Sequence, residues 1–378
     1  MKLVYFDNAA TSYPKPQSVY NAVRRALEES VGNPGRSAHP AAMRSAETVF
    51  SAREAVADFF GTDPERVVFT LNATAALNMA IGGLPFREGR ILISDVEHNA
   101  VLRTVDALCT RTGMTYTVCP TSNIDQEATL SEFRRRFTPD VRAVIMTAAS
   151  NVDGRILPYS EIAAECSTRG VPFLLDASQL AGHRAIDMRH EKITVLCVPG
   201  HKGLLGPMGC GALLLGEGGE RLLPTVFGGN GVDSAELGMG DYIPERYEPG
   251  TVAVPAIAGL HAGIRFLKQF GISEAERREN AVKKRAVEIL SSFPEITVYD
   301  SEGGCAVLSF RHASLPPEKV AAHLARDGIC SRAGLHCAPL SHRTLGTLSV
   351  GGTIRLSFGC FNHPYECDLL YRSLRSLN

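Results

Sequence analysis

The stretch Val198-Pro199-Gly200-His201-Lys202-Gly203 decides how this chain is interpreted. It continues the short apolar run 194–198, which is typical of a buried strand. A lysine amine acts as a nucleophile only where its surroundings lower its pKa, and a strand end that opens into a glycine-rich turn can do so. Taken alone, a Gly-His-Lys triplet more often belongs to an ordinary solvent-exposed loop. Lys202 is therefore a candidate catalytic residue that needs support from the rest of the chain.

A carboxylate at the end of another apolar run supplies that support. Asp176 directly follows the run 171–175. A pyridoxal 5'-phosphate site needs a lysine that forms a Schiff base with the cofactor, and a carboxylate that keeps the pyridine nitrogen protonated. One strand that ends in Asp176 and a later one that leads to Lys202 indicate such a site.

The middle of the chain alternates short β-branched runs with helical spacing. The runs expected to be strands cover residues 67–70, 91–94, 116–118, 143–147, 171–176, 195–198 and 212–215. Crossover helices between them predict an α/β fold with a mainly parallel seven-stranded sheet covered by helices on both faces. Ligands of such sheets bind beyond the carboxyl ends of the strands, where Asp176 and Lys202 fall.

The remaining segments predict an arm and two domains. Residues 1–15 contain Pro14 and are expected to form an extended arm that packs with the smaller domain. Residues 16–255 are expected to form the large cofactor-binding domain, with helices over 17–29 and 41–60. Residues 256–378 are expected to form a smaller C-terminal α/β domain with helices over 256–270 and 275–292 and strands over 296–299, 306–310, 329–331 and 353–357.

Composition excludes several classes of protein. The 378 residues are 44% hydrophobic with a net charge of -1, as expected for a globular chain with a substantial core. No run approaches the roughly 18 apolar residues of a membrane span, and the dispersed basic residues do not indicate nucleic acid. The ten cysteines include no Cys-x-x-Cys, which favours a reducing cytoplasm. Neither HExxH nor a Cys/His quartet occurs, so no metal site is expected.

Two segments of the larger domain add candidate ligands. The stretch 70–78 runs from a strand into a helix rich in small residues, whose first amides and Thr74 hydroxyl could hold a phosphate, although an ordinary helix cap would look the same. His98 follows the next strand and could stack on a flat ring and relay protons. A metal ligand and a surface histidine are the competing interpretations.

The C-terminal domain offers a candidate thiol and a candidate arginine. Cys337 lies in the stretch 332–340, which has basic neighbours and no strand pattern and could therefore expose a reactive thiolate. Cys360 and Cys367 also lie in unpatterned sequence, so composition alone does not decide among the three. Arg355 could grip a substrate carboxylate by two parallel hydrogen bonds or could be a structural arginine at a strand edge.

Together these motifs resemble the class V aminotransferase superfamily, and specifically the second-group cysteine desulfurases together with the selenocysteine lyases. The resemblance runs nearly end to end and includes Tyr5 to Thr11, Asn33 to His39, Ala73-Thr74, Glu97 to Asn99, Ser150-Asn151, Asp176 to Gln179, Gly200 to Lys202, Pro249 to Thr251, Arg332 to Ala338 and Arg355. Each motif is short, but their order and spacing are specific. The resemblance implies a pyridoxal-phosphate-dependent transferase of fold type I.

The resemblance also implies a role for each matching residue. Lys202 would be the Schiff-base lysine, Asp176 the partner of the pyridine nitrogen, and Gln179 a donor to the ring hydroxyl. His98 would stack on the ring. Phosphate contacts would come from Ala73, Thr74 and His201, and from Thr251 of a neighbouring subunit, which implies a homodimer. The substrate would be held by Asn151, Arg355, His39 and Arg332.

The function implied is a cytoplasmic cysteine desulfurase of sulfur metabolism. It would convert L-cysteine to L-alanine and leave the sulfur on Cys337 as a persulfide for an acceptor protein or a thiol. The alternatives are a selenocysteine lyase, another class V β-lyase or aminotransferase, or a catalytically silent sulfur-transfer scaffold. Departures from the family pattern at Pro199, Leu335 and Asn362-His363 affect one phosphate contact and the choice of substrate.

Overall fold

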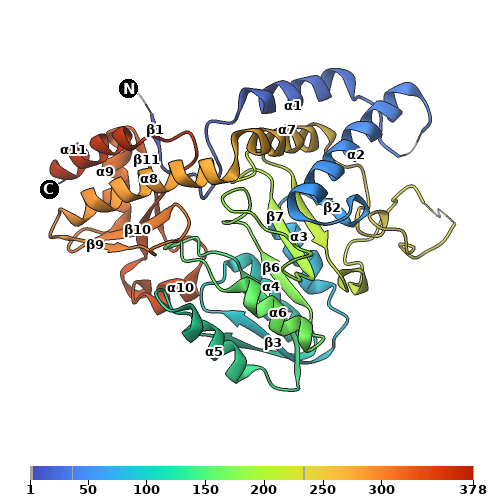
Figure 1. Cartoon of the computed structure of the whole chain (residues 1–378), viewed down its shortest axis with the longest axis horizontal. Helices are drawn as coiled ribbons and strands as arrows, with labels where there is room; N and C mark the ends of the chain where they lie inside the picture. The colour runs from blue at the N-terminus through green and yellow to red at the C-terminus, as the bar shows by residue number, and fades with distance from the viewer. Residues whose placement is uncertain (1–2, 36, 233–234, 378) are drawn as a thin grey trace.

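A computed structural model describes residues 3–35, 37–232 and 235–377, so residues 1–2 of the arm and Arg36 of the motif Asn33 to His39 lie outside it. Its larger lobe is built on a seven-stranded sheet with the strand order β2-β8-β7-β6-β5-β3-β4 (Figure 1). The strands are β2 (Val67–Thr70), β3 (Glu88–Ser94), β4 (Gly113–Cys119), β5 (Val141–Thr147), β6 (Phe173–Asp176), β7 (Val195–Pro199) and β8 (Gly211–Leu215).

The predicted mainly parallel sheet is confirmed. Strands β3 to β7 run parallel to one another, and only β8 is antiparallel to the two strands that it pairs with, β2 and β7. The exception follows from the short connection after Lys202, which contains no helix and so returns the chain in the opposite direction.

Helices cover both faces of this sheet because its strands are apolar on both faces. Leu92 packs into one hydrophobic cluster, whereas its neighbours Ile91 and Ile93 pack into the other, as expected for a strand with a side-chain period of two. The covering helices are α2 (Pro40–Phe60), α3 (Ala73–Gly82), α4 (Asn99–Arg111), α5 (Gln126–Arg136), α6 (Tyr159–Thr168) and α7 (Val254–Phe270), and α1 (Gln17–Glu29) packs on α7.

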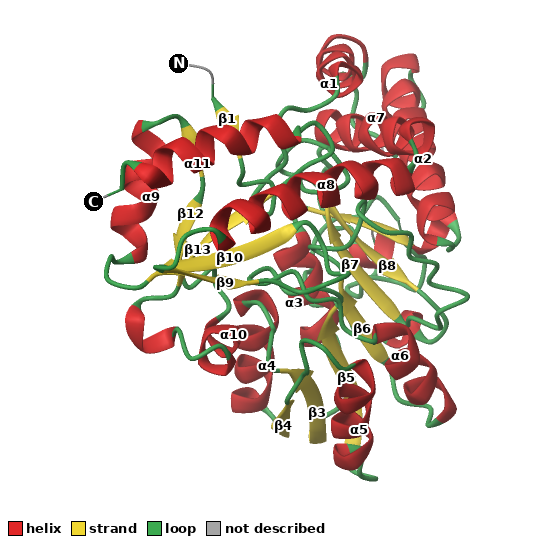
Figure 2. Ribbon diagram, turned by 60° about the vertical axis from the view of Figure 1, so that its left-hand side comes forward, coloured by secondary structure: helices red, strands yellow, loops and turns green. Residues whose placement is uncertain are grey.

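The smaller lobe carries a four-stranded antiparallel sheet with the order β12-β13-β10-β9 (Figure 2). Its elements are α8 (Ile272–Ser291), β9 (Ile296–Tyr299), β10 (Val307–His312), α9 (Pro317–Arg326), β12 (Arg332–Gly334), α10 (Pro339–Thr344), β13 (Thr353–Ser357) and α11 (Cys367–Arg375). Helix α7 contributes Leu260 and Ile264 to the core of the larger lobe. The domain boundary at residue 256 stays a prediction.

One expectation for this lobe was wrong and one strand has an unpredicted partner. Arg332–Gly334 was expected to be loop but forms β12, because it pairs with β13 across a long sequence separation that leaves no local signal. The predicted strand 329–331 does form as β11 (Ile329–Cys330), but it pairs in parallel with β1 (Val4–Tyr5) in a sheet of its own. The N-terminal arm thereby joins the smaller lobe.

The arm then crosses to the larger lobe. Asp7 forms a bridge with Ser357 of β13, and Ser12 N donates a hydrogen bond to the carbonyl of His201 at 3.0 Å. Among the described helices, none has the length and apolar character needed to cross a membrane.

We expect Ile145→Ala to lower the free energy of unfolding by about 2–5 kcal/mol, since it removes buried methyl groups from the centre of the sheet. Ile145 is 0% exposed and packs in the cluster that includes α3 and α4. The control is Ile124→Ala, the same substitution at a side chain that is 95% exposed, which should change the value by less than about 0.5 kcal/mol. Urea unfolding of both variants measures the difference; equal effects would contradict the packing described.

Candidate active site

A cavity at the carboxyl ends of β5, β6 and β7 collects the residues expected to bind the cofactor. Of these, Ala73, Thr74, His98, Asn151, Asp176, Gln179, His201 and Lys202 all line it. They come from the start of α3, from the start of α4 and from the loops after three strands. Sequence positions 73 to 202 therefore meet at one edge of the sheet, as a parallel sheet requires.

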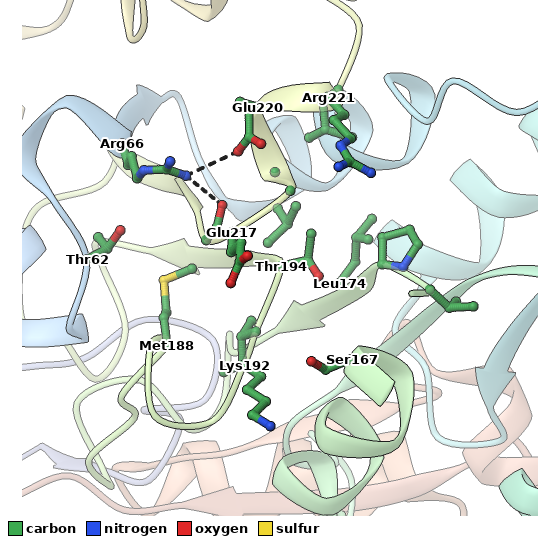
Figure 3. Close-up of a pocket in the computed structure, with 18 of the residues that line it drawn as sticks. Thr62, Arg66, Ser167, Leu174, Met188, Lys192, Thr194, Glu217, Glu220 and Arg221 are labelled. Carbon is green, nitrogen blue, oxygen red and sulfur yellow. Dashed lines mark hydrogen bonds and ion pairs between the residues drawn. The ribbon is translucent and has the colours of Figure 1, made fainter. Parts of the chain in front are cut away.

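A larger cleft of about 890 Å³ lies at the opposite edge, beside the amino ends of β6 and β7 (Figure 3). Its Arg66 donates to the carbonyl of Gly216 at 2.7 Å and to the Glu220 carboxylate at 3.3 Å. The residues that line this cleft include no predicted site residue. We therefore place the candidate chemistry in the smaller cavity.

Lys202 has the lowered pKa that its proposed role needs. Burial lowers the pKa of its amine to about 8; the charges of Arg355 and Arg332 lower it further, and Asp176 opposes the shift. A substantial fraction of the amine is therefore unprotonated slightly above neutral pH. This is the property that lets a lysine act as a nucleophile or as a base.

The turn that carries Lys202 is packed backbone against backbone. A Cβ added at Gly203 would lie 2.3 Å from the carbonyl oxygen of Ala181, and one at Gly182 would lie 2.3 Å from that of Gly203. Gly182 also has a φ of 87°, which glycine adopts without strain. Side chains at these positions would push the turn away from the sheet.

Asp176 is a buried carboxylate that lines the cavity. It ends β6, is 2% exposed, and accepts a hydrogen bond from the amide of Ser178 at 2.9 Å. Gln179 follows, and its side-chain amide donates to the carbonyl of Ala9 at 3.2 Å. The carboxylate and the lysine are therefore held from two neighbouring strands.

The two histidines of the cavity are uncharged near neutral pH. Burial lowers the pKa of His98 to about 4, with Lys202 adding to the effect, and burial lowers the pKa of His201 to about 4 as well. His98 caps α4, because its Nδ1 accepts from the amide of Ala100 at 3.0 Å, which assigns the ring proton to Nε2. Nδ1 of His201 is buried and makes no hydrogen bond within the described part of the chain.

These donors fit pyridoxal 5'-phosphate. Helix α3 begins at the cavity, with Asn72 capping the amide of Ala75 at 2.9 Å, so the earlier amides of Ala73 and Thr74 are free of intrahelical acceptors. A helix start of this kind binds phosphate. His201 Nδ1 is a further unsatisfied polar atom at the same place. Pro199 offers no hydroxyl there, as its sequence position implied.

Glu97 is a buried group whose importance the sequence indicated only as part of a motif. Its Oε1 accepts from the amide of Thr147 at 2.9 Å and from the amide of Ser94 at 3.3 Å, and also from the Ser94 hydroxyl. Burial raises its pKa to about 8, and the charge of Asp176 adds to the shift. Glu97 thus ties the loop that carries His98 to the end of β5.

The loop that carries Cys337 is bonded to the cavity walls. The amide of Asn99 donates to the Cys337 carbonyl at 2.7 Å, and the side chain of Asn151 donates to the His336 carbonyl at 2.7 Å. His336 and Cys337 have φ values of 50° and 58°, so both adopt the left-handed conformation. An Arg332 nitrogen lies 3.7 Å from Sγ of Cys337. A strained loop bonded at both carbonyls holds the thiol beside a cation.

The other two cysteines that the sequence left open are in different surroundings. Cys360 and Cys367 are buried, and burial raises the pKa of each thiol to about 12. Thiols with such values are not thiolates near neutral pH and do not act as nucleophiles. Only the tertiary structure separates them from Cys337, which is half-buried.

Arg355 lies on β13 of the smaller lobe and contacts Asn151 in the wall of the cavity. It is 1% exposed and donates to Oδ1 of Asp7 at 2.9 Å and to the carbonyl of Asn151 at 3.2 Å. Its Nε is buried and has no partner among the described residues. One face of the guanidinium is therefore available to an additional acceptor.

Two predicted site residues do not reach the cavity within this chain. His39 is exposed and caps α2, its Nδ1 accepting from the amide of Ala42 at 3.2 Å. Thr251 is exposed and accepts from the side chain of Asn33 at 3.2 Å. Both lie near the surface of the larger lobe instead.

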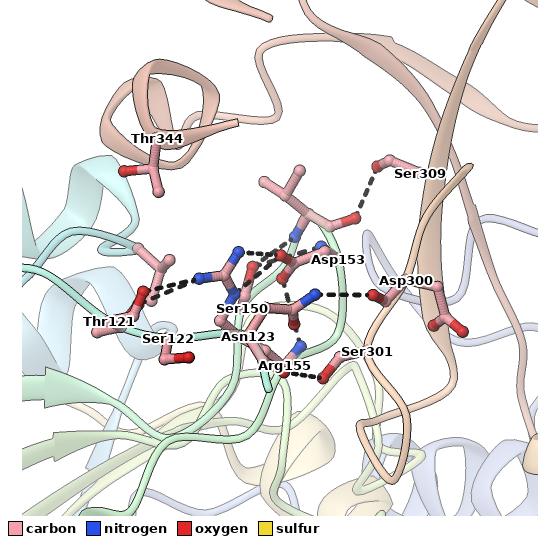
Figure 4. Close-up of polar contacts among 12 residues, drawn as sticks. Thr121, Ser122, Asn123, Ser150, Asp153, Arg155, Asp300, Ser301, Ser309 and Thr344 are labelled. Carbon is pink, nitrogen blue, oxygen red and sulfur yellow. Dashed lines mark hydrogen bonds and ion pairs between the residues drawn. The ribbon is translucent and has the colours of Figure 1, made fainter. Parts of the chain in front are cut away.

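A polar network between the lobes fixes the loop that contains Asn151 (Figure 4). Arg155 donates to Asp153 at 2.8 Å and to the Thr121 hydroxyl at 3.2 Å. From the smaller lobe, the Ser309 hydroxyl donates to the Val152 carbonyl at 2.6 Å. Hydrogen bonds from both lobes to the residues that follow Asn151 therefore hold it against the Cys337 loop.

Comparison with known proteins places this site in a family context. The family model described as aminotransferase class-V matches residues 4–370. A protein named "probable cysteine desulfurase" from Methanothermobacter thermautotrophicus is 31% identical, over 99% of this chain and 94% of its own length. A cysteine desulfurase from Synechococcus elongatus is also 31% identical, over 99% of this chain and 60% of its own length.

Two solved structures share the fold over nearly the whole chain. The apo structure of cysteine desulfurase from Thermococcus onnurineus NA1 has a TM-score of 0.91 and 29% identity, covering 99% of this chain and 95% of its own. The cysteine desulfurase CsdA from Escherichia coli, in an S-sulfonic acid form, has a TM-score of 0.88 and 27% identity, covering 99% and 94%.

We expect Glu97→Gln to remove the part of the pH dependence of the free energy of unfolding that arises from the Glu97 carboxyl. The folded state holds the Glu97 proton up to a pKa of about 8, whereas the ordinary value is 4.5. Because the unfolded state loses this proton first, the wild-type free energy of unfolding should fall relative to that of the variant as pH rises from about 5 to about 8. Urea unfolding at a series of pH values measures both; a constant difference would contradict the assignment.

Proposed function

Since the chain belongs to the class V aminotransferase family, we propose that it is a pyridoxal-phosphate-dependent cysteine desulfurase. The observation that carries the proposal is the hydrogen bonding of the Cys337 loop to Asn99 and Asn151, at the rim of the cavity that contains Lys202. The names of the relatives and of the similar structures support the same activity.

Lys202 and Asp176 would bind the cofactor and support the chemistry at the substrate α-carbon. Pyridoxal phosphate, when bound, supplies an aldehyde that condenses with amines and a ring that accepts electrons from the substrate α-carbon. Lys202 would hold the cofactor and, once released, would take the proton from the α-carbon, which its pKa of about 8 favours. The Asp176 carboxylate would keep the pyridine nitrogen protonated.

The other cavity residues would orient the cofactor. Ala73, Thr74 and His201 would hold the phosphate at the start of α3, and Gln179 would donate to the ring hydroxyl. His98 would stack on the ring, and its lowered pKa keeps it neutral there, so it adds no charge against the bound ring.

Arg355 and Asn151 would hold the amino acid. The partnerless Nε of Arg355 can donate to a carboxylate oxygen beside the bond to Asp7, and a carboxylate accepts such bonds strongly. His39 and Arg332 are further proposed substrate contacts. Because His39 is exposed on this chain, its contribution would come through a second subunit.

Cys337 would then collect the sulfur. Its thiolate attacks the sulfur of bound cysteine, an S–S bond forms, the carbon–sulfur bond breaks, and the carbon fragment takes up protons to leave as alanine. The enzyme retains a persulfide. The Arg332 guanidinium near Sγ stabilises the negative charge on the attacking sulfur. A thiol or an acceptor protein must remove the persulfide before the next turnover.

The proposed enzyme is a homodimer. Thr251 is exposed on one chain and would contact the phosphate in its partner. The larger lobe also exposes Met43, Phe50 and Phe227, which are 56%, 52% and 69% exposed. A second copy would cover these apolar side chains.

We expect Cys337→Ala to keep the cofactor and lose sulfur transfer. The variant should retain the visible absorbance of the lysine-bound cofactor, while persulfide formation from L-cysteine falls by at least about a hundredfold because no other thiol is reactive at the site. Cys109→Ala is the control, since Cys109 is also half-buried but lies on α4, and it should behave as wild type. Full sulfide release by the Cys337 variant would overturn the proposal.

A substrate panel distinguishes the related activities. Purified protein is given L-cysteine, L-selenocysteine and L-cystine in turn, and alanine and enzyme-bound persulfide are measured. We expect alanine and persulfide in equal amounts from L-cysteine. Turnover of selenocysteine alone would indicate a lyase, and a protein that stays colourless with added cofactor would indicate a silent scaffold.

A further inference from the structure

Residues 7–15 of the N-terminal arm contact both sides of the candidate site. The geometry points to Lys15 as a positioning residue, which fixes the backbone of the turn that carries Lys202. This inference rests on the proposed function, because it assigns the arm a task in the chemistry of Lys202.

Hydrogen bonds from the arm converge on one peptide group of the turn. The carbonyl of His201 accepts from Lys15 Nζ at 2.7 Å, from the Ser12 amide at 3.0 Å and from the Thr11 hydroxyl at 3.1 Å. The Ser12 hydroxyl donates to the next carbonyl, that of Lys202, at 2.8 Å, and Lys15 Nζ also donates to this hydroxyl at 2.7 Å. The arm therefore binds the carbonyls on both sides of the Lys202 α-carbon.

This convergence sets the direction of the catalytic side chain. The His201 carbonyl and the Lys202 amide belong to one planar peptide unit, so fixing the carbonyl leaves that unit no freedom to rotate. Gly200 and Gly203 flank the turn and contribute no side chains that could hold it. The bonds from the arm add to the one that the Leu205 amide donates to the Lys202 carbonyl at 2.9 Å.

The surroundings of Lys15 do not suit a purely structural lysine. Its hydrogen bonds within the described chain go to a carbonyl and a hydroxyl, and burial lowers the pKa of its amine to about 8. A partly buried ammonium whose acceptors are neutral adds less to stability than a carboxylate-paired one, because part of its hydration is lost. It does make a strong, charge-assisted bond to the carbonyl beside Lys202.

The other end of the arm touches the substrate side of the cavity. Asp7 pairs with Arg355 at 2.9 Å, and the carbonyl of Ala9 accepts from Gln179 at 3.2 Å. One short segment therefore contacts the arginine proposed to hold substrate, a glutamine at the cofactor and the turn of Lys202. A movement of the arm at Asp7 would therefore also move the turn that carries Lys202, and a movement at Lys15 would move Arg355.

The test compares Lys15→Met with Lys15→Arg in the full-length protein loaded with pyridoxal phosphate. Methionine keeps the length of the side chain but removes the donor, so kcat should fall about tenfold, with the KM for L-cysteine changed less than about twofold. The pH at which the absorbance of the lysine-bound cofactor changes should shift from the wild-type value, because a turn that is no longer held places Lys202 differently relative to Asp176, Arg355 and Arg332, whose charges act on its pKa. Arginine should restore most of both values.

Lys268→Met is the matched control, because Lys268 is an exposed lysine of α7 paired with Asp58. It should match wild type in every readout. Thermal unfolding checks that each variant is folded. If Lys15→Met does not fold, Ser12→Ala, which removes the bond to the Lys202 carbonyl, should give the same two changes to a smaller extent.

Three outcomes would overturn the inference. The first is a Lys15→Met variant whose kcat and absorbance titration match those of wild type. The second is an equal loss of kcat in Lys15→Met and Lys15→Arg. The third, where Ser12→Ala is the variant used, is no change in its kcat or in its absorbance titration. The titration needs no turnover of substrate. If wild type bound the cofactor but did not release alanine from cysteine, the proposed function would fail while the titration still tested Lys15.

Discussion

The structure depends on keeping a lysine amine partly buried beside a carboxylate at the end of a parallel sheet. Strands β6 and β7 pair with Asp176 opposite Cys197, so the chain reaches Lys202 just beyond the same edge. Removing water from the amine lowers its pKa to about 8, and Asp176 limits the shift. The surrounding features serve this arrangement: the two-sided core makes the sheet rigid, and the glycines let the turn pack on its backbone.

The rim of the cavity is built from chain segments far apart in sequence. Arg355 lies in the smaller lobe, Asp7 in the arm, and Asn151 after β5, yet hydrogen bonds join them directly. The Cys337 loop is bonded to Asn99 and Asn151 in the same way. Polar contacts at the site itself therefore help to join the lobes, which couples the placement of the thiol to that of the cofactor pocket.

Helices and strands were predicted correctly where the local sequence pattern was strong. Buried strands such as β5 and β7 were found because they are short, continuous apolar runs, and α1 was found with its exact bounds because its apolar spacing is helical. The strand β12 was missed because Arg332–Gly334 has no apolar pattern and is a strand only through its pairing with β13. Glu97 appeared only as a motif member, since no sequence pattern reports the burial of a carboxylate.

The sequence alone determined which residues follow which strands, and hence that Asp176, His98 and Lys202 meet at one edge of a parallel sheet. The tertiary structure alone decided which of Cys337, Cys360 and Cys367 is accessible, that Asp7 pairs with Arg355, and that the arm binds the carbonyls around Lys202. The physical reason is the range of the interactions. Periodicity and strand ends are local properties of the chain, whereas burial, pKa and contacts between lobes arise only once distant segments exclude water from one another.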